Sequence, residues 1–445
     1  MKPACCSGVR QRWLLVALLL AASMPCDVGW VYAAQAGRPL QPRHTRTDTP
    51  TLRHDVLTRL TAAQREADTG GLDEAERLLA ALERDYPASS GARALNGYER
   101  ANVYNFRAWI RYTKKDFPAA IRAWEQVLAQ PGLPEPMEES TRYSLAQLYL
   151  ASSDWKRAAA MLDAWFRLAD DPAPEAYVLL AQARYQLGQH DAALQGIGRA
   201  LAEARSRGQP PRENWYLLQR MASFAKGDLA ATAATLEELA GRWPRKDYFV
   251  QLAGIFGELG EPVRRLAALE TAYRSGWLTA ERELLNLVYL YLDNGTPMRA
   301  AHVLERGMQQ GQVEADARNL ELLGAALREA RENRRAVEVL TRAATLANDA
   351  QAWLRVASLE LEENANEDAV AAAHRALDLG GGSRPDSVQI VLGMALYNLG
   401  RYVDARSAFN EAARDRRSRQ SAEQWLRFLD TEITRADRLA RDFDH

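Results

Sequence analysis

Residues 390–413 read IVLGMALYNLGRYVDARSAFNEAA, and this stretch decides the fold. Apolar residues recur at spacings of three and four on both sides of Gly400, which predicts two amphipathic helices joined by a short turn. Gly393 lies in the middle of the first helix, while Ala405 and Phe409 lie on the second. The small residues let the paired helices approach closely, and the larger apolar residue fills the space between them. The stretch therefore predicts a helix–turn–helix unit.

The same pattern recurs along the chain. Residues 177–201, YVLLAQARYQLGQHDAALQGIGRAL, match it with Ala181, Gly188 and Ala193 at the corresponding places. The small anchor residue of each second helix serves as a ruler. Its equivalents lie at positions 75, 120, 158, 193, 232, 265, 300, 336, 369 and 405, with Thr at 232 and Arg at 265. Most of the gaps are close to the period of about 34 residues that is typical of tetratricopeptide repeats.

This repeat predicts an all-α fold, a right-handed tetratricopeptide-type helix-pair solenoid of about ten repeats over residues 59–419. Residues 420–445 are predicted to form a C-terminal capping helix and tail, because apolar residues lie there at helical spacing. These residues are Trp425, Phe428, Leu429 and Ile433.

The N-terminal segment has a different character. A basic leader, the apolar run LLVALLLAA at 14–22 and the small residues VYAAQA at 31–36 follow in the order of a secretory signal peptide. The run is shorter than the roughly 20 residues of a spanning helix, although an uncleaved anchor and lipidation at Cys26 remain alternatives. We expect a signal peptide at 1–36, a flexible linker at 37–58 and a periplasmic location.

Composition and motifs argue against several classes of function. The chain has 57 Lys and Arg against 58 Asp and Glu, so its net charge of −1 does not favour a nucleic-acid partner. No two histidines lie three or four residues apart, so no helix presents a two-histidine metal face. HExxH, GxSxG and P-loop motifs do not occur. We expect a non-enzymatic protein with no catalytic residues, no cofactor and no metal.

The remaining candidate for a functional site is a surface that recognises another protein. In repeats of this type the first helices line the concave side, and the fifth, ninth and twelfth places point into the groove. Aromatic rings and amides at these places are typical of peptide-binding surfaces. Packing between repeats is the alternative for each single residue, but recognition is favoured for the groove as a whole. The predicted partner-binding residues are Asn105, Trp109, Tyr112, Tyr143, Gln147, Gln182, Tyr185, Leu217, Met221, Phe224, Leu285, Tyr289, Met394 and Tyr397.

A run of arginines lies between the last repeat and the capping helix. It comprises Arg414, Arg416, Arg417 and Arg419. These side chains are expected to pair either with an acidic partner or with carboxylates of the capping helix, and the second interpretation is favoured.

Longer stretches resemble one particular family. They include ERANVYNFRAWIRYTKKDFPAAIRAWEQVL at 99–128, TRYSLAQLYLASSDWKRAAAMLDAWF at 141–166 and ELLNLVYLYLDNGTPMRAAHVLERGM at 283–308. Over residues 60–435 the chain resembles periplasmic tetratricopeptide proteins that accompany TonB–ExbB–ExbD energy-transduction systems in Gram-negative bacteria. The resemblance implies an adaptor that binds TonB or an ExbB-like component, supports TonB-dependent uptake and has no catalytic residues to carry over.

Two other functions remain open. The chain is alternatively an adaptor for envelope assembly, or the scaffold subunit of a secreted enzyme complex. In each case its partner is a protein, and no spanning segment is expected in the mature chain, although peripheral association with a membrane complex fits the first interpretation.

Overall fold

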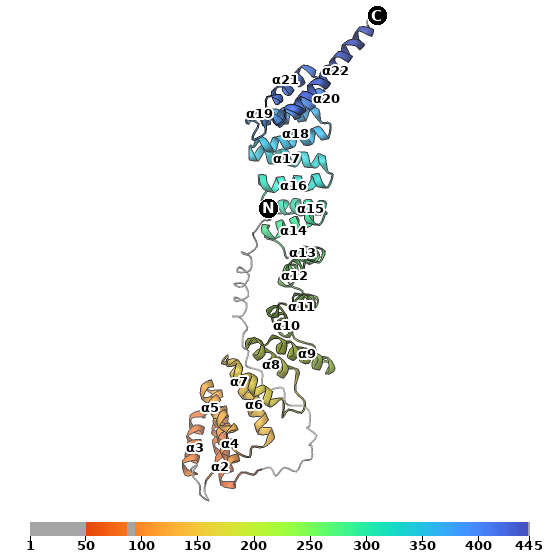
Figure 1. Cartoon of the computed structure of the whole chain (residues 1–445). Helices are drawn as coiled ribbons and strands as arrows, with labels where there is room; N and C mark the ends of the chain where they lie inside the picture. Colours follow the sequence, from red (N-terminus) through yellow and green to blue (C-terminus); the bar gives the residue numbers. More distant parts are fainter. Residues whose placement is uncertain (1–49, 87–93, 444–445) are drawn as a thin grey trace. The chain divides into compact units, whose positions relative to one another are not determined.

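The structure is a computed structural model that describes residues 50–86 and 94–443, with side chains as far as residue 435. Every regular element in these ranges is a helix, from α2 to α22 (Figure 1). This confirms the predicted all-α helix-pair fold. The predicted signal peptide and most of the predicted linker lie outside the described residues.

The described residues divide between Arg100 and Ala101 into two compact units. In the first unit, α2 (His54–Asp68) packs against α3 (Leu72–Asp85). Helix α2 thus begins at His54, within the predicted linker, rather than at residue 59, where the predicted solenoid begins. The reason is that Val56 is fully buried on the same side of the helix as Ala63, so its burial stabilises an earlier helix start.

The second unit is built from alternating first and second helices, and α4 crosses from the first unit into it. The first helices are α4 (Gly97–Thr113), α6 (Glu135–Ala151), α8 (Pro174–Gln186), α10 (Glu213–Lys226), α12 (Lys246–Glu258), α14 (Glu281–Asp293), α16 (Ala317–Glu329), α18 (Ala350–Glu362) and α20 (Pro385–Asn398). The second helices are α5 (Phe117–Leu128), α7 (Trp155–Trp165), α9 (His190–Ser206), α11 (Leu229–Arg242), α13 (Pro262–Arg274), α15 (Pro297–Gln309), α17 (Asn333–Ala347), α19 (Asn366–Asp378) and α21 (Tyr402–Ala413). The last helix, α22 (Arg419–Phe443), packs on α21.

The anchor residues of the second helices are buried as the repeat predicts. Every alanine among them is fully buried, and Thr232 is nearly so. Arg265 is the exception, because its long side chain cannot fit into the space of an alanine. Its stem instead passes over Gly257 of α12, where the position of an added Cβ would lie 3.6 Å from the Arg265 Cδ. A glycine on the facing helix therefore compensates for the large residue.

The small residue in the middle of a first helix is needed for close packing. A Cβ added to Gly393 of α20 would lie 2.6 Å from Cε1 of Phe409 on α21. The same holds for Gly324 of α16, where the added atom would lie 2.5 Å from two carbons of Leu340 on α17. Such distances are far below an ordinary contact between carbons. The pairing of small and large residues inferred from residues 390–413 is thus the pairing in the structure.

A repeated ion pair also links successive second helices. An arginine directly before the anchor residue pairs with a glutamate that lies five residues after the anchor of the preceding unit. The four pairs are Arg157–Glu125, Arg264–Glu237, Arg299–Glu270 and Arg335–Glu305, at 3.2, 2.7, 3.2 and 2.6 Å. Since these side chains are partly exposed to water, each pair contributes little to stability. The pairs supplement the apolar stacking and do not replace it.

Helix α22 covers the end of the last pair, as predicted for a capping helix. The indole of Trp425 stacks on the ring of Phe409, with centroids 5.5 Å apart and planes inclined by 5°. Leu429 is fully buried. The aromatic contact and the burial of Leu429 shield the apolar side of α21 from water, which is the purpose of a terminal cap in a repeat protein.

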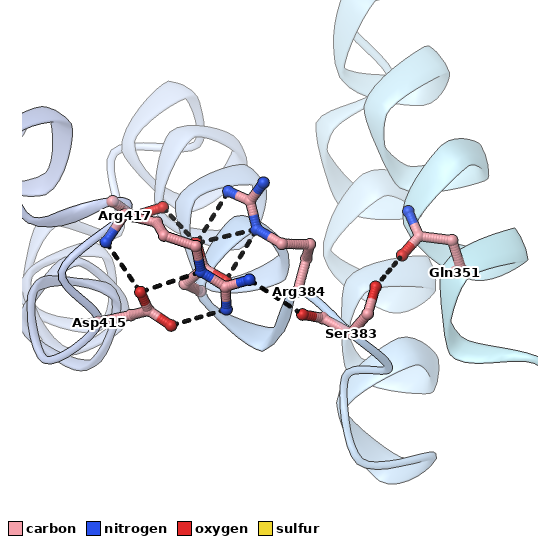
Figure 2. Close-up of polar contacts among 7 residues, drawn as sticks. Gln351, Ser383, Arg384, Asp415 and Arg417 are labelled. Atoms are coloured by element: carbon pink, nitrogen blue, oxygen red, sulfur yellow. Dashed lines mark hydrogen bonds and ion pairs between the residues drawn. The ribbon is translucent and has the colours of Figure 1, made fainter.

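The arginine run joins this cap to the last repeat. Figure 2 shows Arg417 beside Asp415 and Arg384, close to the backbone of Ser383. The carboxylate of Asp386, which is almost completely buried, accepts from Arg417 at 3.2 Å, from Arg384 at 2.9 Å and from the hydroxyl of Ser418 at 2.6 Å. Hydrogen bonding to Arg384 is the main cause that lowers the pKa of Asp386.

The sequence analysis favoured pairing of these arginines with carboxylates of the capping helix. This prediction is wrong for Arg414 and Arg417, the residues of the run whose acidic partners the structure describes. Arg417 pairs with Asp415 in the turn and with Asp386 of α20, and Arg414 pairs with Glu411 of α21. The run precedes the body of α22, so these side chains reach back onto the last repeat.

Candidate partner-binding face

The fourteen predicted binding residues all lie on first helices, namely α4, α6, α8, α10, α14 and α20. None of them is buried. Asn105, Phe224 and Tyr289 are exposed, and the other eleven are partly exposed. We use the term first-helix face for the fifth, ninth and twelfth places of the first helices. This face is accessible in the free chain, but its residues differ in how far packing engages them.

On α4, packing accounts for most of the predicted residues. The indole Nε1 of Trp124 on α5 donates to the side-chain oxygen of Asn105 at 2.9 Å. The ring of Tyr112 lies 6.1 Å from that of Trp124, and Trp109 stacks on Phe106 of the same helix at 5.8 Å. These contacts hold the rings in place within the pair α4–α5.

Packing also engages the next two helices. Tyr143 on α6 lies 4.9 Å from the indole of Trp165 on α7, and burial raises the pKa of its hydroxyl. Tyr185 on α8 lies 5.6 Å from the ring of His190. Gln147 and Gln182 keep part of their amide-bearing side chains in solvent beside these rings.

At the far end of the unit, the chain's own cap covers part of the face. The ring of Tyr397 on α20 lies 5.8 Å from that of Trp425 and 5.4 Å from that of Phe428, both on α22. Met394 is partly buried against the same apolar core. Tyr397 therefore contributes to the attachment of the cap, a contact that a local repeat pattern does not contain.

The middle of the unit leaves large apolar side chains in solvent. Phe224 on α10 is 51% exposed and Tyr289 on α14 is 45% exposed. Val250, on α12 between them, is 41% exposed and was missed by the sequence reasoning. Counting back three residues from the small residue Ala253 would have found it at the fifth place. We call this part of the first-helix face the middle face, defined as Leu217, Met221, Phe224, Val250, Gly254, Leu285 and Tyr289.

The three helices of the middle face are joined directly. The guanidinium of Arg220 on α10 donates through Nη1 to the side-chain oxygen of Gln251 on α12 at 2.8 Å. The ammonium of Lys246 on α12 pairs with Glu283 on α14 at 2.7 Å. First helices of successive repeats are therefore neighbours here, and a partner segment could contact all three at once.

Arg220 departs from the repeat pattern. It occupies the eighth place of α10, where most first helices carry alanine or glycine and α14 carries Val288. Its Nε atom is buried and lacks a hydrogen-bond partner, and burial lowers the pKa of its guanidinium. The sequence reasoning missed this residue because it examined the fifth, ninth and twelfth places, whereas the eighth is ordinarily a packing position.

Neither a membrane span nor a metal cluster occurs in the described part of the chain. Within residues 50–86 and 94–443, no helix combines the length and the apolar character of a bilayer-spanning segment. Across those same ranges, no group of three or more His, Cys, Asp or Glu side chains is arranged to hold a metal ion.

The chain is similar to known repeat proteins over part of its length. Residues 143–210 and 367–423 match the model of the tetratricopeptide repeat family, and no curated protein matches the chain. A crystal structure of a tetratricopeptide repeat protein from Parabacteroides merdae is 16% identical, with 62% of this chain and 100% of that chain covered and a TM-score of 0.33.

Two further solved structures are similar. That of the MamA protein is 21% identical and covers 40% of this chain and 94% of its own, with a TM-score of 0.33. That of YrrB, described as a TPR protein with an unusual peptide-binding site, is 15% identical and covers 43% of this chain and 96% of its own, with a TM-score of 0.34. The residues that match the tetratricopeptide repeat family, 143–210 and 367–423, lie within a series of helix pairs that extends beyond both.

Proposed function

We propose that this protein is a non-enzymatic periplasmic adaptor, which binds a segment of another protein on its first-helix face. The observation that carries the proposal is the exposure of Phe224, Val250 and Tyr289 on three successive first helices. Exposed aromatic residues with amides beside them are the usual anchors of protein recognition. A continuous row of helices also suits an extended or helical segment.

The proposed partner is TonB or an ExbB-like component, and the proposed role is support of TonB-dependent uptake. The support for this identity is the resemblance of residues 60–435 to the tetratricopeptide proteins of such systems. The signal-peptide pattern of residues 1–36 supports the periplasmic location. A mature protein whose measured mass includes residues 1–36 would argue against export by cleavage of this leader.

In-cell photocrosslinking tests the binding surface. A photoreactive phenylalanine is placed at position 224 or 289 of the full-length protein, and the attached proteins are identified by mass spectrometry. Val263 on α13 and Val403 on α21 provide matched controls, because they are exposed apolar residues, at 72% and 82%, on second helices. We expect the first-helix positions to attach a TonB-system protein and the second-helix controls not to do so.

The possible results separate the two parts of the proposal. Attachment of a different envelope protein from positions 224 and 289 would refute the TonB assignment and leave the adaptor surface standing. Equal attachment from all four positions, or attachment from none, would refute the surface. The exposed Phe224→Ala and Tyr289→Ala are better tests of uptake than Trp109→Ala or Tyr185→Ala, since the structure gives the latter two rings packing contacts.

A further inference from the structure

We propose that the partner segment bound on the middle face carries an aspartate or glutamate beside large apolar residues, and that Arg220 binds this carboxylate. The inference rests on the proposed function, since it names the chemistry of the segment that the adaptor takes. Three features of the molecule support it: the surroundings of Arg220, the apolar side chains around it and the bare backbone of α12.

Arg220 has no carboxylate partner among the described residues. Its one hydrogen bond is to the neutral amide of Gln251 at 2.8 Å, and the charge effects on its guanidinium come from Tyr248 and Tyr185. The acid on its own helix, Glu213, is already engaged by Arg245 at 2.8 Å and by the hydroxyl of Tyr248. Arg220 is therefore a partly buried cation without a counter-ion.

This situation is unusual within the molecule and costs free energy. Arginine keeps its charge at any physiological pH, and a charge removed from water is unfavourable unless it is paired. Elsewhere in the unit, arginines that link first helices have acids opposite them, as Arg355 on α18 has Glu321 on α16. A carboxylate supplied from outside would remove the deficit, because guanidinium and carboxylate form strong charge-assisted hydrogen bonds.

The side chains around Arg220 indicate which residues lie beside the acid in the bound segment. Met221 follows it directly and Phe224 lies one turn further along α10, where its ring is half exposed. Across the Arg220–Gln251 hydrogen bond, Val250 of α12 is also exposed. An acidic side chain that reaches Arg220 would thus be flanked by apolar surface, which favours large apolar neighbours in the bound segment.

The backbone of α12 is open at the same place. Gly254 is exposed in the interior of α12, and an added Cβ there would meet no atom within 4 Å. Packing within the chain therefore does not require a glycine, although glycine destabilises a helix interior by about 1 kcal/mol. A missing side chain at this point lets a bound segment approach the helix closely. Gly254 therefore supports the place where the segment binds, while Arg220 determines that the segment carries a negative charge.

Selection from a defined peptide library tests the proposal. The purified full-length protein is used to enrich a phage-displayed library of random twelve-residue peptides. We expect the enriched sequences to carry Asp or Glu next to Leu, Ile, Phe or Trp. One enriched peptide is then synthesised with a fluorescent label, together with a twin in which the acid is replaced by its amide, and the Kd of each is measured by fluorescence anisotropy.

A double-mutant cycle then isolates the predicted contact. Arg220→Gln in the protein and the amide replacement in the peptide should each weaken binding by about tenfold, and the two together by no more than either alone. Arg199→Gln on α9 is the matched control, because Arg199 is an exposed arginine on a second helix. This control should leave the Kd unchanged for both peptides.

A second pair of variants locates the site without touching Arg220. Gly254→Leu places a side chain on the middle face, and Gly198→Leu places the same side chain on α9, where an added Cβ also meets no atom within 4 Å. We expect the first variant to abolish peptide binding and the second to preserve it, with neither melting below the parent protein by circular dichroism. If Arg220→Gln does not fold, Arg220→Lys replaces it in the cycle and should retain part of the affinity.

Several results would overturn the inference. They are enriched peptides without acids, equal affinity of the acid and amide peptides, additive losses in the cycle, and failure to enrich any peptide. Binding that depends on Gly254 but not on an acid would leave the proposed function intact and refute the role of Arg220. Peptide binding that is insensitive to Gly254→Leu would refute the middle face as the docking surface, whereas failure of the crosslinks from positions 224 and 289 would refute the proposed function itself.

Discussion

The clearest test of the packing argument is the substitution Gly393→Ala, which adds one methyl group to α20. The new Cβ would lie 2.6 Å from Cε1 and 2.8 Å from Cδ1 of Phe409. The ring has little room to move away, because it is fully buried and Trp425 stacks on it with centroids 5.5 Å apart. Relief of the clash must therefore displace α21, the capping helix or both.

The expected loss can be bounded from two opposing effects. Forcing an extra methyl group into a well-packed core costs about 1–3 kcal/mol. Alanine stabilises a helix interior by about 1 kcal/mol relative to glycine, which offsets part of this cost. We therefore expect Gly393→Ala to lower the free energy of unfolding by up to about 2 kcal/mol. The identical change at Gly254, where the added Cβ meets no atom within 4 Å, should raise it by about 0.5–1 kcal/mol.

Hydrogen exchange followed by mass spectrometry measures both variants. Repeat proteins unfold partly unit by unit, so the amides of α20, α21 and α22 should exchange faster in Gly393→Ala, while those of α12 should exchange more slowly in Gly254→Ala. Urea unfolding followed by circular dichroism reports the global change. Phe409→Leu added to Gly393→Ala should recover part of the loss. If both glycine substitutions stabilise the protein, the close-packing argument is wrong.

Three smaller tests address charge. Asp386→Asn should destabilise the junction of the last repeat with the cap by about 1–3 kcal/mol, since two arginines and a hydroxyl lose a buried carboxylate; unchanged exchange in α22 would contradict this. Arg299→Ala should cost less than about 1 kcal/mol in urea unfolding, because its pair with Glu270 is partly exposed, and a larger loss would mean that the ladder is a main source of stability. Burial, with added repulsion from Asp368, raises the pKa of Glu360 from its usual 4.5 to about 7. The folded chain holds this proton more tightly than the unfolded chain, so the stabilising contribution of protonated Glu360 is complete below pH 4.5 and is lost as the pH rises through 7. Glu360→Gln should therefore reduce the difference between the urea midpoints measured at pH 5 and at pH 8. An unchanged difference would contradict the raised pKa of Glu360.

Much of the fold could be predicted because its rules are local. The positions of helix pairs follow from apolar spacing, and the contact of Gly393 with Phe409 joins residues only sixteen apart in a repeating frame. Even the departure at Arg265 is compensated nearby, by Gly257. The start of α2 was placed too late, because a prediction that rests on the repeat has no information about the segment before the first copy.

The candidate site was predictable only in outline. The repeat places correctly assigned the fourteen residues to the first helices, and none of them is buried. They did not distinguish Tyr143, whose ring lies against Trp165, from Phe224, whose ring is half exposed. Whether each of these residues binds a partner remains a prediction that the crosslinking experiment tests.

The amino-acid sequence alone determined the helix pairs, their period and the small residues at which they meet, because these depend on neighbours along one or two helices. Only the tertiary structure decided which side chains stay in solvent and which charges find partners. Tyr397 is covered by a helix that follows the repeats, and Arg417 reaches Asp386 on α20, whereas Arg220 meets only an amide. The physical reason is that exposure and charge pairing depend on contacts between separate repeats, which spacing within one repeat does not specify.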